Sequence, residues 1–102
     1  MKTASYKLTN GNREMKMRVS LNDTNRMEVA FTAEEKLSGE IVLKFGKRLT
    51  NINAEAVRDV LEADSYEHMM ERIKELFFGT AFAYELFVEF LRSRQIVPDE
   101  AI

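Results

Sequence analysis

The sequence predicts an α+β fold, a four-stranded antiparallel meander followed by two or three α-helices packed on one face of the sheet. Two observations support this prediction. Apolar and polar residues alternate in the first half of the chain, as in half-buried strands, whereas apolar residues recur at helical spacing in the second half. A length of 102 residues with 45% hydrophobic content fits one core. We therefore expect residues 1–102 to form a single domain, with strands at about 3–46, helices at about 54–96 and a short acidic C-terminal tail.

Three segments show the two-residue period of strands that share one apolar face. The alternation runs from Met15 to Leu21, from Met27 to Phe31 and from Ile41 to Phe45. A fourth strand precedes them, because Asn10-Gly11 is a strong signal for a two-residue hairpin turn. The register that follows from this turn pairs Tyr6 with Met15, Ala4 with Met17 and Lys7 with Glu14.

The next two connections differ in length. A second loop with an odd number of residues keeps the apolar side chains of both strands on the same face of the sheet, since a slip of one residue turns every side chain to the opposite face. Asp23-Thr24-Asn25 satisfies this condition, with Leu21 opposite Met27 and Asn25 in the left-handed conformation. The third connection, residues 33–39, is predicted to be a longer loop with room for a helical turn.

Capping signals divide the second half into helices. Asn53 is a suitable N-cap for a helix over 54–63, and Asp64 with Glu67 has the spacing of a capping box for a helix that begins near Tyr66. Gly79 followed by Thr80 indicates a helix end and a new start. A continuous, kinked helix over 66–95 is the alternative.

The last helix has an unusually wide apolar arc. At 100° per residue the arc covers roughly 240°, whereas a buried helical stripe is typically slightly over 100° wide. If Phe82, Leu86 and Phe90 face the sheet, the other side needs a second cover. We expect that cover to be a second copy of the chain, in a homodimer, or another protein; the competing expectation is that the preceding helices provide it. The predicted interface residues are Phe78, Tyr84, Phe87, Val88 and Leu91.

The composition argues against catalysis and against metal or cofactor binding. Without cysteine there is no disulfide framework and no thiol chemistry, which favours a reducing cytoplasm. His68 is the only histidine, and no phosphate-binding glycine loop or nucleophile motif occurs. The most apolar run contains Glu85 and Glu89 and is too short for a membrane span, and the N-terminus lacks the features of a signal peptide. We expect no enzymatic activity, no cofactor, no metal and no membrane partner.

Charge is distributed unevenly along the chain. Residues 1–50 carry ten Lys/Arg and six Asp/Glu, whereas residues 51–102 carry five and eleven. Two alternative functions follow: binding of nucleic acid by the basic strand face, and mimicry of nucleic acid by the acidic helical half. The strand face also holds glutamates and lacks aromatic residues on which bases stack, so we do not expect nucleic acid to be the partner. The basic residues concerned are Lys16, Arg18, Arg26 and Lys44.

Protein–protein contact is the function that best fits the sequence. We expect a small non-enzymatic protein that acts through its C-terminal helix, by self-association, by binding an unidentified partner as an inhibitor or an assembly factor, or by both. Small proteins without cysteine or catalytic motifs are frequent among bacteriophage and mobile-element genes, which is an association and not a physical argument.

Overall fold

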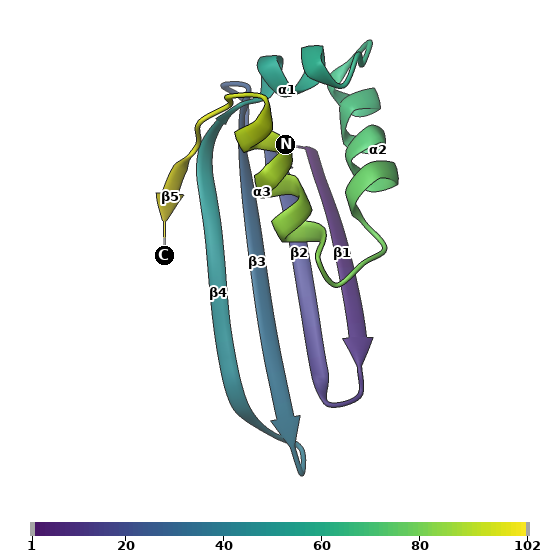
Figure 1. Cartoon of the computed structure of the whole chain (residues 1–102), viewed down its shortest axis with the longest axis vertical. Helices are drawn as coiled ribbons and strands as arrows, with labels where there is room; N and C mark the ends of the chain where they lie inside the picture. The colour runs from purple at the N-terminus through teal and green to yellow at the C-terminus, as the bar shows by residue number, and fades with distance from the viewer. Residues whose placement is uncertain (1, 102) are drawn as a thin grey trace.

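The computed structural model describes residues 2–101 and confirms the predicted architecture. An antiparallel sheet carries three helices on one face, and its other face is uncovered (Figure 1). The sheet contains one strand more than predicted, because a fifth strand follows the last helix. The elements are β1 (Lys2–Asn10), β2 (Arg13–Leu21), β3 (Arg26–Leu37), β4 (Glu40–Asn53), α1 (Ala54–Val60), α2 (Tyr66–Phe77), α3 (Ala83–Ser93) and β5 (Asp99–Ala101).

The first hairpin turns one residue later than predicted. Gly11 and Asn12 form its two-residue loop, and Gly11 occupies the first loop position with φ +62°, where a tight hairpin turn requires positive φ. The pairing therefore moves by two residues, and Tyr6 lies opposite Met17 instead of Met15. A shift of two preserves the faces, so the inward side chains are those predicted although their partners differ. The observed register also pairs Ala4 with Val19 and Lys7 with Lys16.

The second hairpin has the predicted loop. Leu21 lies opposite Met27, and Asn25 has a φ of 58°. The side chain of Asn22 stabilises the loop, because its Oδ1 accepts hydrogen bonds from the backbone N–H of Thr24 at 2.9 Å and of Arg26 at 3.0 Å.

The third connection is a tight turn, and the predicted longer loop is wrong. Ser38 and Gly39 form this turn, with φ values of 53° and 83°, as a type I′ hairpin requires. Strand β3 therefore continues through residues 33–37, and β4 runs for 14 residues instead of ending near Gly46. The third hairpin is the longest in the sheet and extends past the N-terminal end of α3 (Figure 1).

Two irregularities interrupt the pairing of β3 with β4. One lies between Met27 and Val29, whose partners on β4 are Ile52 and Leu49. The extra residue in β4 lets both partners point into the core, and Asn51 has a φ of 56° there. The second irregularity lies opposite Glu35 and Lys36. Strand β5 pairs with β4 only along residues 48–50 and replaces the expected acidic tail.

Side-chain caps begin α1 and α2. Asn53 caps α1 as predicted, since its Oδ1 accepts a hydrogen bond from the Ala56 N–H at 3.2 Å. Helix α2 is capped by Ser65, one residue after the predicted Asp64, because the Ser65 hydroxyl accepts from the His68 N–H at 3.0 Å. The His68 Nδ1 in turn accepts from the Asp64 N–H at 3.1 Å. Ser65 and His68 thus form a variant of the capping box, in which the side chain at the third helical position bonds the N–H of the residue before the N-cap.

Helices α2 and α3 are separate, which excludes the continuous kinked helix. Residues 78–82 connect them, and Gly79 has a φ of 109° that ends α2. Thr80 does not cap α3, whose N-cap position is Phe82. The Thr80 hydroxyl instead accepts a hydrogen bond within the connection, from the Phe82 N–H at 3.3 Å.

Helix α3 is turned the opposite way from the prediction. Phe87 and Leu91 are buried, whereas Phe82 and Leu86 are 66% and 47% exposed. The ring of Phe87 lies 5.2 Å from that of Phe77 on α2. Tyr84 packs on Phe31 of the sheet, with ring centroids 5.4 Å apart. Most of the wide apolar arc is therefore covered within the chain, on one side by the sheet and on the other by α2, whereas Phe82 and Leu86 remain exposed.

Candidate protein interface

A group of exposed apolar side chains lies at the distal end of the third hairpin. Its five side chains are between 45% and 61% exposed, although three of them were predicted to face the core. We call this group the hairpin surface; it consists of Leu37, Ile41, Val42, Leu43 and Phe45.

The hairpin surface is exposed because the helices do not reach it. Helix α3 covers the sheet as far as Phe31, which contacts Tyr84. The next aromatic ring toward the hairpin turn is Phe45, 6.0 Å from Phe31, and it is already half exposed. Beyond that point no helix lies over β3 and β4 (Figure 1). The alternation of residues 41–45 correctly predicted a strand, but alternation does not report whether another element packs on its apolar side.

Strand β4 also has a free edge along this surface. Strand β3 pairs with one side of β4 over its whole length, but β5 pairs with the other side only at residues 48–50. Residues 40–47 therefore have one side without a neighbouring strand within the part of the chain that the structure describes. An exposed apolar strand with a free edge readily pairs with a strand of another chain.

The interface predicted on the last helix lies mostly inside the molecule. Tyr84, Phe87 and Leu91 are buried, and Val88 and Phe78 are partly buried. Phe78 stacks on Tyr6 of β1, with ring centroids 5.5 Å apart. Their side chains stabilise the fold, and the assumption that placed them on an outer surface is wrong because α3 is turned the other way.

The exposed side of α3 forms a smaller apolar surface. Phe82 and Leu86 are its main members, and Leu76 at the end of α2 is also exposed. Glu85 and Glu89, on the same helix, are exposed as well. We call Phe82 and Leu86 the helix surface. It contains fewer apolar side chains than the hairpin surface and has no free strand edge.

The four basic residues considered for nucleic acid lie on the uncovered face of the sheet, as predicted, with Arg26 far from Lys44. Arg26 pairs with Asn53 and Lys44 with Glu34, positions separated along β3 by eight residues, or about 27 Å. Lys44 forms an ion pair with Glu34 at 3.6 Å and Lys16 with Glu14 at 3.3 Å. Arg48, which the sequence reasoning did not consider, forms an ion pair with Glu28.

Glu14 is the most strongly paired carboxylate on this face. Lys7 and Lys16 lie directly opposite each other, and their ammonium groups lie 3.4 Å and 3.3 Å from the Glu14 carboxylate. Desolvation acts to raise the pKa of Glu14. The hydrogen bonds and charges of Lys16 and Lys7 together outweigh this effect, so the pKa lies below its ordinary value. Cross-strand pairing thus reduces the positive charge of the sheet.

A shallow hollow with a volume of about 440 Å³ lies beside these residues. Its lining includes the small side chains of Ser5, Ala30 and Thr32 and the basic side chains of Lys16 and Arg18. Arg18 is exposed, and its neighbour across the strand pair is Ala30. The hollow is therefore a concave part of the uncovered face with basic residues in its lining.

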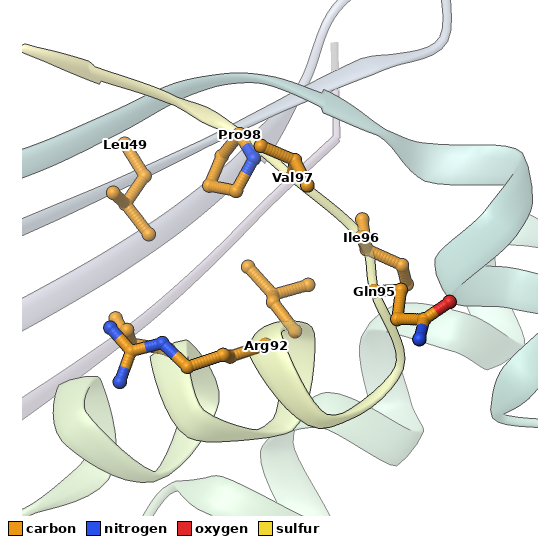
Figure 2. Close-up of a pocket in the computed structure, with 8 residues that line it drawn as sticks. Leu49, Arg92, Gln95, Ile96, Val97 and Pro98 are labelled. Atoms are coloured by element: carbon orange, nitrogen blue, oxygen red, sulfur yellow. The ribbon is translucent and has the colours of Figure 1, made fainter.

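A second groove, of about 420 Å³, lies between α3 and the segment leading to β5. Figure 2 shows Leu49 and Pro98 on one side of it and the Arg92 side chain across from them. The Arg92 guanidinium is paired with Glu89 at 3.3 Å. The lining is mainly aliphatic, and its polar side chains are Arg92 and Gln95, so the groove presents no pair of an acid and a base.

The described residues, 2–101, contain no group of three or more His, Asp or Glu side chains placed to hold a metal ion. The carboxylate nearest to the His68 imidazole is that of Asp64, with 3.9 Å between Nδ1 and Oδ2, and His68 serves as part of the α2 cap. Over the same residues, no helix is long and apolar enough to cross a membrane.

No protein-family model, curated protein or solved structure matches this chain. The geometry described above is therefore the basis for assigning a function.

Proposed function

We propose that this protein acts by binding other protein chains, without catalysing a reaction, and that the hairpin surface is its binding site. The observation that supports this proposal is the coincidence of five exposed apolar side chains with the free edge of residues 40–47. Exposed apolar patches of several hundred Å² in soluble proteins commonly mark interaction sites.

The free edge indicates how a partner would bind. A strand added along residues 40–47 would make backbone hydrogen bonds with β4, and its alternate side chains would pack on the hairpin surface. Backbone hydrogen bonds contribute affinity with little dependence on sequence, whereas the side-chain contacts select the partner. The proposed role as an inhibitor or assembly factor in a reducing cytoplasm, of a kind found among bacteriophage genes, is compatible with such a site.

Affinity capture from the native cell tests the proposal with matched variants. The hairpin variant, Ile41→Glu/Leu43→Glu, adds two negative charges to the hairpin surface. The helix variant, Phe82→Glu/Leu86→Glu, adds the same charges at other exposed positions. We expect a specific protein to be retained by the wild type and the helix variant and lost from the hairpin variant. Retention by the hairpin variant would refute the assigned site, and loss with the helix variant alone would return the contact to the C-terminal helix.

Nucleic-acid binding is the second candidate, favoured by the hollow beside Lys16 and Arg18. Basic side chains around a concave surface suit phosphate groups. The glutamates paired with Lys16, Lys44 and Arg48 oppose this function, since each neutralises a cation that would contact phosphate.

A further inference from the structure

The free edge of β4 has a specific arrangement of charges around its apolar residues. Glu40 begins the free segment, Ile41 to Leu43 follow, and Lys44 and Lys47 lie toward the other end. Within residues 2–101, Glu40 and Lys47 are in no ion pair, whereas Lys44 is paired with Glu34. The segment therefore has a negative end and a positive end, with charged groups available to a partner at both.

We propose that the strand added to this edge is β4 of a second copy of the chain, antiparallel to the first, so that the two sheets join into one. This proposal rests on the proposed function and names its partner. A two-fold axis near the middle of residues 40–47 would bring Glu40 of each chain to the Lys44–Lys47 end of the other. A parallel arrangement would place like charges together. The segment is thus complementary to itself in the orientation that closed, two-fold dimers use.

The neighbouring strand limits how far the two chains overlap. Because β5 occupies β4 at residues 48–50, the second copy has access only to residues 40–47. Val42 is the extra residue at which β4 departs from regular pairing with β3, so two β4 segments can pair regularly only on either side of it.

The exposed apolar side chains set an upper limit on the area that the dimer would bury. If each side chain of the hairpin surface exposes roughly 80 Å², the five together present on the order of 400 Å² per chain. Homodimer interfaces are about 65% apolar, so complete burial of this surface corresponds to about 600 Å² per chain and about 1,200 Å² in total. That upper limit lies at the lower end of the range for specific, stable interfaces, about 1,200–2,000 Å².

Light scattering on purified protein tests the proposal at concentrations from about 5 to about 200 μM, a range that includes typical dimer affinities. We expect the wild type to have twice the single-chain mass of 11.8 kDa and the hairpin variant to have the single-chain mass. The helix variant should remain a dimer. Circular dichroism of each variant checks that the fold is retained. In hydrogen exchange, the amides of residues 40–47 should exchange more slowly as the wild-type concentration rises, because pairing protects edge amides.

Charge reversal tests the orientation of the two chains. Glu40→Lys alone and Lys47→Glu alone should each weaken dimerisation several-fold, since each places like charges together. The double variant Glu40→Lys/Lys47→Glu should restore the dissociation constant to within about twofold of the wild type, because it exchanges the two charges. Absence of rescue would overturn the antiparallel arrangement.

Other results would overturn the second copy as the partner. A wild type with the single-chain mass over the whole concentration range would do so, as would a dimer that dissociates in the helix variant and persists in the hairpin variant. A monomeric wild type that still captures another protein through the hairpin surface would leave the proposed function standing. A monomer that captures nothing through this surface would refute both.

Discussion

Truncation of Phe87 tests the orientation of α3, on which the assignment of both apolar surfaces depends. Phe87 is fully buried, and its ring lies 5.2 Å from that of Phe77 and 6.0 Å from that of Phe90. Replacement of a buried Phe by Ala costs about 3–5 kcal/mol, and the loss of two aromatic contacts favours the upper part of that range. We expect Phe87→Ala to lower the free energy of unfolding by about 4 kcal/mol.

Phe82→Ala is the matched control, since it removes the same side chain from the same helix at an exposed position. We expect it to cost less than about 1 kcal/mol, as surface substitutions usually do. Both changes leave the charge and the hairpin surface unaltered. The difference between the two variants therefore measures which side of α3 is buried.

Urea denaturation followed by circular dichroism provides the measurement. With an m value of about 2 kcal/mol per M, a loss of 4 kcal/mol lowers the midpoint by about 2 M. The thermal midpoint should fall by about 16 °C or more. Near-equal losses, or a larger loss for Phe82→Ala, would mean that α3 packs through Phe82 and Leu86 and would refute the orientation described here.

Three further predictions concern the sheet. The pairing with Lys7 and Lys16 lowers the folded-state pKa of Glu14, so this residue stabilises the fold above its ordinary pKa of about 4.5. This contribution is lost as the pH falls through the folded-state pKa. In urea titrations between about pH 5 and pH 3, the free energy of unfolding should therefore fall further for the wild type than for Glu14→Gln. Gly39→Ala should lower the free energy of unfolding by about 1 kcal/mol, because φ at Gly39 is +83°, and an unchanged urea midpoint would contradict the tight turn. Fluorescence anisotropy with single-stranded DNA should show no binding at physiological salt; binding that falls steeply with salt and is abolished by Lys16→Gln/Arg18→Gln would instead assign the hollow to nucleic acid.

The strands and their faces could be predicted because a two-residue period reports directly which side chains point the same way. The same period does not determine partners when two turns are compatible with it. Asn10-Gly11 and Gly11-Asn12 both place residues suited to a tight turn at the loop, and only the observed one pairs Tyr6 with Met17. The later part of β4 was missed because the extra residue near Asn51 breaks the alternation that marks a strand.

The orientation of α3 and the location of the exposed surface could not be predicted from the same reasoning. An apolar arc of roughly 240° has no polar boundary to show which part faces the sheet, and Phe82 and Phe87 are equally apolar. Exposure of Phe45 depends on where α3 begins relative to the strands, and the face of Ile41 depends on the irregularity opposite Glu35 and Lys36; a local sequence pattern contains neither feature. The capping position of α2 was predicted to within one residue, because Asp64 and Ser65 are both good N-caps.

The order of elements along the chain has a consequence for biosynthesis. All four long strands form hairpins with their sequence neighbours, so the meander can assemble from contacts of short range, which favours rapid folding. The side chains that cover the inner face come from the three helices, and those of α3, which cover Phe31, leave the ribosome about 40 residues after the sheet at a rate of roughly 5–20 residues per second. For a few seconds the nascent sheet carries its apolar face uncovered. During this interval a chaperone, or the nascent chain's own neighbours on a polysome, would meet the surface that Phe87 and Leu91 later close.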